Sequence, residues 1–296
     1  MNFAVAKVLV PPTHKGGATN FAIREASYID QDKVFLHAIN KELLTRPRGK
    51  RKLLLFIHGY NTNLFDGLFR LTQLVHDVQS PAVPVLFSWA SRATFTNYVY
   101  DLNSATIARD DLERTIRLIF QSEAEEVNVV AHSMGNWVTV EAIRQISISG
   151  NRPPVEKLGH IILAAPDIDV DVFKSQMRRI GKPKKPYLVM ISKDDLALRV
   201  SSLLAGGQKR IGAAEDVAEL TALGAVVVDL SDISSSDRLG HGKFADLASI
   251  GSDLPKVLQR GINENRASGP GGAIGASMTV PLAILGAPIR FISGQR

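Results

Sequence analysis

The sequence predicts an α/β protein whose mostly parallel β-sheet is covered by helices on both faces. Short apolar runs rich in β-branched residues alternate with longer stretches of helical periodicity, which is typical of parallel strands joined by helices. The chain has 296 residues, of which 45% are hydrophobic and 22% charged, so it can bury a sizeable core. The expected strands lie at residues 53–57, 127–131, 187–192 and 226–230.

Composition divides the chain into three parts. Residues 1–32 are expected to form an N-terminal extension, residues 33–262 a single α/β domain, and residues 263–296 an apolar tail rich in glycine and proline. Glycine and proline weaken the tail as a spanning helix, so we expect it to dock on the domain, with a peripheral membrane contact as the alternative. The N-terminus lacks the pattern of a signal peptide, so we expect a cytoplasmic protein, with membrane association through the tail left open.

Residues 127–135 carry the strongest functional signal. The apolar stretch 127–131 predicts a buried strand, and the residues after Gly135 continue with helical spacing. Ser133 stands between them, with Ala131 and Gly135 two positions to either side, where only small residues let neighbouring backbone approach. A strand, a tight turn and a helix in this order are typical of a serine nucleophile, so Ser133 is predicted to be one.

A second apolar strand, at residues 53–57, leads into the loop 58–63, which begins His-Gly-Tyr-Asn. In serine hydrolases of this arrangement such a loop supplies one backbone N–H to the developing oxyanion, and the residue after the nucleophile supplies the other. We therefore predict an oxyanion hole formed by the N–H groups of Tyr60 and Met134. His58, at the start of the loop, is expected to order it.

A serine nucleophile on such a turn works with an acid and a histidine that follow it in this order along the chain. His241 lies between two glycines after the last predicted strand and is the predicted base. The acid is expected at Asp195, directly after the strand 187–192. Its neighbour Asp194 fits the same place, and the earlier pair Asp167 and Asp169 is the third choice.

These segments together resemble the α/β-hydrolase superfamily, and within it an esterase- or lipase-like serine hydrolase family formerly labelled a domain of unknown function. The resemblance covers roughly residues 20 to 260 and implies the α/β-hydrolase fold and hydrolysis of ester-like bonds, without naming a substrate. The family pattern of an aspartate followed by x-Ala-Leu favours Asp195 as the acid. The matching segments are residues 58–61, 87–89, 131–136, 195–198 and 240–241.

The predicted function is cleavage of a carboxylic ester through an acyl-serine intermediate, with a small-molecule or lipid-like ester as the substrate. The alternative is a catalytically inactive α/β-hydrolase-like protein that serves as a binding or scaffold module. The sequence contains neither metal-ligand spacing nor a phosphate-binding glycine loop, so no cofactor and no metal are predicted. The net charge of +6 comes with short basic runs but no nucleic-acid-binding motif, so nucleic acid is not an expected partner.

Several further residues have weaker signals. Residues 88–110 mix aromatic and small polar side chains, which fits either an acyl pocket or packing against the sheet. Asp101 is expected to cap the helix that runs to Phe120. His132 adjoins the nucleophile and is expected to point away from it. The histidines outside any motif are His14, His37, His76 and His160.

Overall fold

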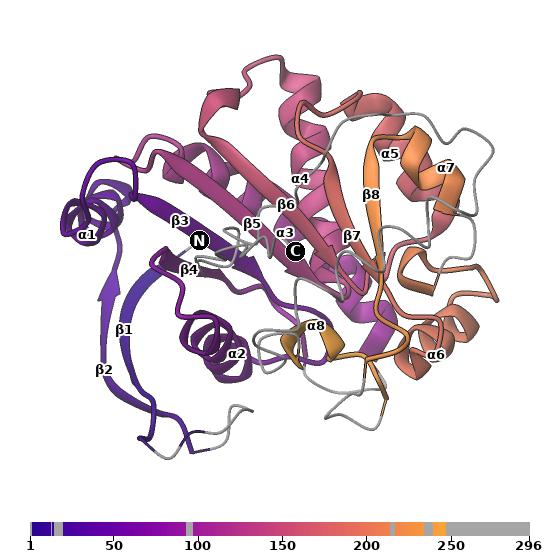
Figure 1. Ribbon diagram of the computed structural model, residues 1–296, viewed down its shortest axis with the longest axis horizontal. Helices are drawn as coiled ribbons and strands as arrows, with labels where there is room; N and C mark the ends of the chain where they lie inside the picture. Colours follow the sequence, from indigo (N-terminus) through magenta and orange to yellow (C-terminus); the bar gives the residue numbers. More distant parts are fainter. Residues whose placement is uncertain are drawn as a thin grey trace, which may run out of the picture.

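The computed structural model describes residues 2–12, 14, 20–92, 97–213, 217–233 and 239–246 (Figure 1). Within these residues, six strands form the main sheet in the order β4-β3-β5-β6-β7-β8, and all of their pairings are parallel, which confirms the parallel sheet predicted from the sequence. The carboxyl ends of all six strands therefore meet at one edge. The strands are β3 (Lys52–Ile57), β4 (Val83–Phe87), β5 (Glu126–His132), β6 (Leu158–Ala164), β7 (Tyr187–Ile191) and β8 (Ala225–Asp229).

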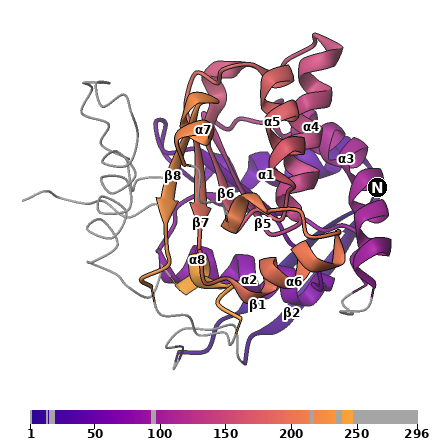
Figure 2. The same cartoon turned by 90° about the vertical axis from the view of Figure 1, so that its right-hand side faces the viewer.

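Helices cover both faces of this sheet (Figure 2). Successive side chains of a strand point to opposite faces, so Leu55 of β3 packs in one buried cluster and Phe56 in the other. The Phe56 face is covered by α2 (Leu64–Asp77) and α8 (Lys243–Asp246). The Leu55 face is covered by α1 (Asp32–Leu44), α3 (Tyr98–Ile119), α4 (Gly135–Ser149), α5 (Val170–Ile180) and α7 (Val217–Ala222). The remaining elements are α6 (Leu196–Leu204) and the short turns η2 (Val155–Lys157) and η3 (Ile211–Ala213).

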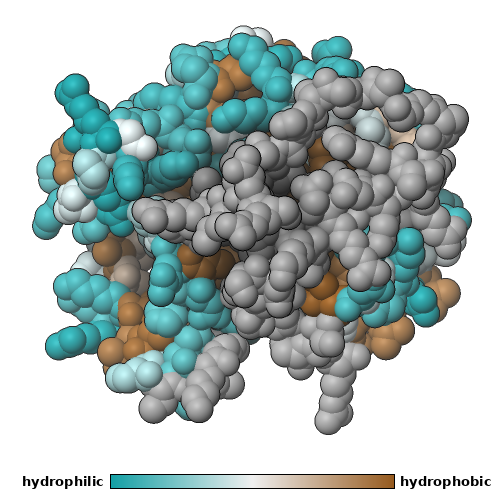
Figure 3. Space-filling model, in the orientation of Figure 1, coloured by the Kyte–Doolittle hydropathy of each residue, from teal (hydrophilic) through white to brown (hydrophobic). Residues whose placement is uncertain are grey.

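The N-terminal extension folds as an antiparallel hairpin of β1 (Phe3–Leu9) and β2 (Ala22–Ile29). Phe3 stacks on Phe35 of α1, with ring centroids 4.1 Å apart, and Phe21 meets Phe69 of α2 edge-on at 6.1 Å. An isolated two-stranded hairpin is marginal in water, so these contacts to the helices support it. On the face seen in Figure 3, hydrophobic patches are scattered among hydrophilic surface.

The structure corrects the prediction for Asp101 and the helix that follows it. The helix expected to begin after Asp101 begins at Tyr98 with Asn97 as its N-cap, so the capping role predicted for Asp101 is wrong. Asp101 lies in the first turn instead, and its carboxylate accepts hydrogen bonds from Ser91 Oγ at 2.7 Å and Arg92 N at 3.0 Å. It thereby ties Ser91 and Arg92 to the first turn of the helix.

The predicted tail, residues 263–296, lies outside the described residues, and so does its proposed membrane contact. Phe95, one of the aromatic residues of the segment 88–110, also lies outside them. Among the helices that are described, none combines the length and the apolar character needed to cross a bilayer.

Candidate active site

Ser133 occupies the tight turn between β5 and α4 in a backbone conformation that few residues adopt. Its φ is +53° and its side chain is buried. Non-glycine residues in this left-handed region mark a constrained turn. The turn is held by Ser133 N–H, which donates to the carbonyl of Ala164 in β6 at 3.0 Å, and by the buried amide of Asn136, which donates to the carbonyls of Ser133 and Ala164 at 2.9 Å.

Two glycines allow the backbone to close around this turn. A Cβ atom on Gly59 would stand 2.6 Å from Ser133 Cβ, and one on Gly135 would stand 2.7 Å from the carbonyl oxygen of Ile57 and closer still to that of His58. Any side chain at either position would push the loop after β3 away from the serine. The small residues that the sequence shows here are therefore required by close packing.

The loop after β3 is ordered by His58, as the sequence suggested. Its Nε2 accepts a hydrogen bond from Trp89 N–H at 3.1 Å, its Nδ1 lies 2.9 Å from the carbonyl of Gly59, and its ring stacks on Trp89. Burial lowers the pKa of His58, which keeps the ring neutral and able to accept at Nε2. Tyr60, two residues on, is half-buried beside Tyr98, with ring centroids 5.4 Å apart.

His241 and Asp195 form a direct pair. Nδ1 of His241 lies 2.7 Å from Oδ2 of Asp195, whose side chain is fully buried. The other carboxylate oxygen of Asp195 accepts from Leu198 N–H at 3.0 Å, because Asp195 is also the N-cap of α6. The carboxylate of Asp195 thus both contacts His241 and caps α6, whereas the sequence had allowed either Asp194 or Asp195 to pair with the histidine.

His132 fastens the loop that carries His241. Its Nε2 lies 3.1 Å from the carbonyl oxygen of His241, and its ring packs against those of His241 and Phe244 at 4.7 and 4.8 Å. Burial lowers the pKa of His132 well below the ordinary histidine value, and electrostatic repulsion from the nearby His241 is a second, smaller cause. The ring is therefore a neutral donor from Nε2, a role that the sequence did not reveal.

The other candidate acids have different partners. Asp169 is the N-cap of α5 and accepts from the N–H groups of Asp171 and Val172. Asp194 binds Lys243 Nζ at 2.7 Å, and although burial alone would raise its pKa, hydrogen bonds from Lys243 and Ser192 lower it. The carboxylate that Nδ1 of His241 contacts is that of Asp195.

Asp167 belongs to a buried polar network beside the serine turn, where its N–H donates to the carbonyl of Ser133 at 3.3 Å. Its Oδ1 accepts from Ser201 Oγ at 2.7 Å and lies 3.2 Å from Nε of Arg210, while its Oδ2 accepts from the Tyr98 hydroxyl at 3.1 Å. Arg210 Nη2 also donates to the Tyr98 oxygen at 3.1 Å. Burial and the nearby Asp167 raise the pKa of Tyr98, so its hydroxyl remains protonated and donates.

Ser133 and His241 border the same pocket as the network around Asp167. This pocket, of about 130 Å³, lies at the carboxyl edge of the sheet. The pocket brings together Tyr60, Ser133 and His241 with Tyr98, Asp167 and Ser201 of the network. Its remaining walls are mostly apolar and include Leu198, Val200, Leu204 and Leu239. A wider hollow, lined largely by charged residues that include Arg51 and Glu125, lies at the opposite edge of the sheet.

Of the residues that line this pocket, the sequence had pointed to Tyr60, Ser133 and His241, and to Asp167 as an alternative acid. Met134, the other predicted oxyanion residue, is fully buried and is the N-cap of α4, where helix N–H groups carry partial positive charge. Arg210 and Ser201 had no sequence signal, because a lone arginine or serine in a polar stretch resembles any surface residue. Asn136 stood within the quoted motif, but its role in holding the turn emerged only from its contacts.

A family model described as "Alpha/beta hydrolase of unknown function (DUF900)" matches residues 32–260. The chain belongs to this family. Membership in DUF900 agrees with the parallel sheet and with a serine on the turn after β5, and it assigns the chain to the α/β hydrolases without giving a substrate. No curated protein is similar enough in sequence to match the chain.

Several solved structures are distantly similar to this DUF900 chain. An esterase from Pyrobaculum calidifontis is 12% identical with a TM-score of 0.39, over 80% of this chain and 94% of that one. LpqC, a poly(3-hydroxybutyrate) depolymerase from Bordetella parapertussis, is 14% identical with a TM-score of 0.38, over 67% and 76%. A fungal esterase from Rhizomucor miehei is 10% identical with a TM-score of 0.36, over 88% and 85%. Similarities this distant say nothing about the reaction.

Proposed function

We propose that the protein hydrolyses carboxylic esters, with Ser133 as nucleophile, His241 as base and Asp195 as the acid that orients the base. The observation that carries the proposal is the 2.7 Å contact between His241 Nδ1 and Asp195, in a pocket that His241 shares with Ser133. Histidine, paired with a buried carboxylate and near a serine on a tight turn, is the arrangement that activates a hydroxyl.

The reaction follows from which ring nitrogen holds the proton. Because Nδ1 of His241 donates to Asp195, Nε2 is the nitrogen that takes the Ser133 proton as Oγ attacks the ester carbonyl. The imidazolium so formed is stabilised by the Asp195 carboxylate and returns the proton to the leaving alcohol. Water, deprotonated by the same nitrogen, then attacks the acyl-serine and releases the carboxylic acid.

The tetrahedral oxyanion requires donors on the side away from His241. We assign the N–H groups of Tyr60 and Met134 to this role, because Tyr60 follows Gly59, which lies against Ser133, and Met134 begins α4. A Cβ atom on Gly59 would stand only 2.6 Å from Ser133 Cβ, so the two segments lie too close for a side chain between them, which supports this assignment.

The size of the pocket suggests the class of ester. Its volume of about 130 Å³ is smaller than the roughly 300–1,000 Å³ of pockets that enclose drug-sized ligands. Its walls are mainly apolar, apart from the network at one side. We therefore infer a short acyl group rather than a long lipid chain.

The test is labelling with a fluorophosphonate probe, together with hydrolysis of p-nitrophenyl esters of increasing acyl length. We expect the wild type to be labelled and to prefer short acyl chains, Ser133→Ala to lose both labelling and turnover, and His241→Ala to lose turnover. Ser149→Ala, at the other end of α4, is the matched serine control and should behave as wild type.

Two results would overturn the proposal. A folded wild type that neither labels nor hydrolyses any of these esters would favour the inactive binding or scaffold module. Labelling that persists in Ser133→Ala but disappears in another serine variant would move the nucleophile elsewhere. Preference for long acyl chains would leave the chemistry intact but contradict the inferred substrate class.

A further inference from the structure

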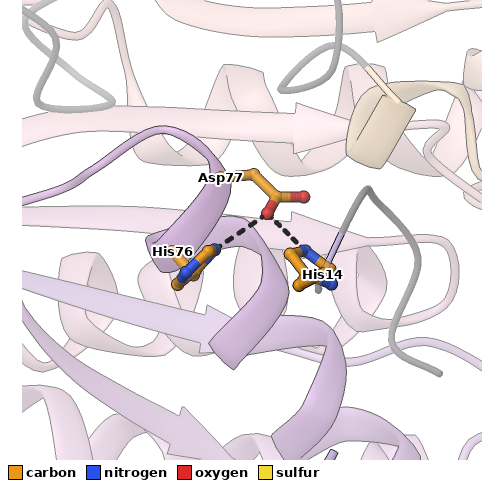
Figure 4. Close-up of side chains that lie close together, drawn as sticks. All are labelled: His14, His76 and Asp77. Carbon is orange, nitrogen blue, oxygen red and sulfur yellow. Dashed lines mark hydrogen bonds and ion pairs between the residues drawn. The ribbon is translucent and has the colours of Figure 1, made fainter. Parts of the chain in front are cut away.

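Two histidines and an aspartate meet at the C-terminal end of α2, and none of them lines the pocket (Figure 4). Asp77 is the last residue of α2 and His76 precedes it, whereas His14 comes from the connection between β1 and β2. Oδ1 of Asp77 lies 2.6 Å from Nε2 of His14 and 3.2 Å from Nδ1 of His76. The ligand atoms of the three side chains all lie within 4.8 Å of one another.

The carboxylate of Asp77 lies in a place that is unfavourable for a negative charge. Its side chain is only 10% exposed, and the C-terminal end of a helix carries partial negative charge, which repels anions and attracts cations. Among the described residues, the partners of its side chain are the two imidazoles, with neither lysine nor arginine. A buried carboxylate in this position requires compensating positive charge.

The donor set and its geometry suit a transition-metal ion. Zinc takes imidazole nitrogen and carboxylate oxygen at about 2.0–2.2 Å in a tetrahedron, which separates the ligand atoms by about 3.3 Å. The His76 and Asp77 atoms already have that separation, and His14 would need to withdraw by only about 0.7 Å. His14 is 4% exposed but His76 is 49% exposed, so a fourth ligand can reach the ion from solvent.

We propose that His14, His76 and Asp77 bind a divalent transition-metal ion, with zinc as the best match to two imidazoles and a carboxylate. Each imidazole binds as the neutral ring, with its proton on the nitrogen that does not face the ion, and any second proton passes to the buffer. Water completes the four-coordinate shell.

Such an ion would join the N-terminal hairpin to the main domain. His14 lies in the hairpin connection, beside Phe21 with ring centroids 5.1 Å apart, and α2 packs on the sheet through Leu71 and Leu74. The open end of the hairpin is already fixed by the stacking of Phe3 on Phe35. The metal would fix the opposite end, where β1 connects to β2. Because metal binds the folded state alone, it stabilises that state in proportion to its free concentration.

The experiment uses the full chain without a polyhistidine tag, stripped with a chelator and titrated with zinc chloride by calorimetry. We expect saturation at one equivalent, a rise in Tm with added zinc, and the absorption bands of tetrahedral cobalt(II) when cobalt replaces zinc. His76→Ala and Asp77→Asn should each weaken the affinity by at least about tenfold and remove most of the Tm shift. His37→Ala, at an exposed position of α1, should bind as wild type.

These variants separate the metal site from a simple hydrogen-bonded link between hairpin and helix. His76→Ala changes a half-exposed side chain at a helix end, so it is expected to fold even if His14→Ala does not. Zinc that fails to saturate, or that binds His76→Ala and Asp77→Asn as tightly as wild type, would overturn the proposal. Ester hydrolysis is measured separately, so failure here leaves the proposed function untouched.

Discussion

Asp195 and Asp167 are both buried carboxylates near Ser133, but their partners differ in kind. Asp167 faces Arg210, a side chain that keeps its positive charge at any accessible pH, and its oxygens also accept from Ser201 and Tyr98. Asp195 faces His241, whose charge can appear and disappear. A carboxylate with a permanent counter-ion stabilises structure, whereas one paired with an imidazole can stabilise a charge that exists only during the reaction.

The comparison is tested most strongly by Asp195→Asn. The amide would not hold Nδ1–H of His241 in the same way and would not stabilise the imidazolium, so kcat should fall by about 10³–10⁴-fold. Asp194→Asn, one residue away, affects only the bonds from Lys243 and Ser192 and should lose far less. Steady-state kinetics on a short p-nitrophenyl ester, with circular dichroism to verify folding, measures both; equal losses in the two variants would contradict the assignment.

Arg210→Ala tests the other side of the pocket. It leaves the carboxylate of Asp167 buried without its counter-ion, so the free energy of unfolding should fall by about 3–5 kcal/mol, measured by urea unfolding. The double variant Asp167→Leu with Arg210→Met, which removes both charges, should recover much of that loss. A single variant that loses less than about 1 kcal/mol would show that the pair is not structural.

His132→Phe tests how far the position of His241 depends on its loop. Phenylalanine keeps the ring against Phe244 but removes the Nε2 donor to the carbonyl of His241, so kcat should fall roughly tenfold with little change in KM. His132→Gln, which can still donate, should recover part of the activity. An unchanged kcat in His132→Phe would mean that the loop is fixed by its other contacts.

The smallest expected effect concerns stability at acidic pH. Burial holds the pKa values of His58 and His132 below 6.5, so these rings remain neutral in the folded protein while the unfolded chain takes up protons. Stability should therefore fall as pH drops below about 6.5, by about 1 kcal/mol per pH unit for each such histidine. Urea unfolding at pH 7.0 and 5.5 measures this; His132→Phe should show a smaller drop, and an identical drop would refute its contribution.

Much of the fold could be predicted because its signals are local. The apolar runs in β3, β7 and β8 are continuous in sequence, and that of β5 is interrupted by Asn128; strands buried on both faces favour this pattern. The predicted N-cap of α3 was wrong by four residues, because Asp101 has the side chain of a cap but accepts hydrogen bonds from Ser91 and Arg92 instead. Local propensity does not reveal which backbone a carboxylate will contact.

In the candidate site, too, the residues with a local sequence signal were predicted and the others were not. Ser133 and His241 were found because a strained turn and a loop between glycines leave marks on neighbouring residues. Asp195 was predicted as the acid from the family pattern, but Asp194 stayed an alternative, because adjacent carboxylates differ only in where each side chain points. In the structure His241 contacts Asp195, while Lys243 takes the other.

The sequence by itself thus determined the parallel sheet, the serine turn and the small residues around it, since each depends on side chains close together in the chain. Only the tertiary structure joined Asp167 to Arg210, His132 to the carbonyl of His241, and His14 to Asp77. Those partners are separated by 43, 109 and 63 positions, so their contact depends on how helices and loops pack onto the sheet.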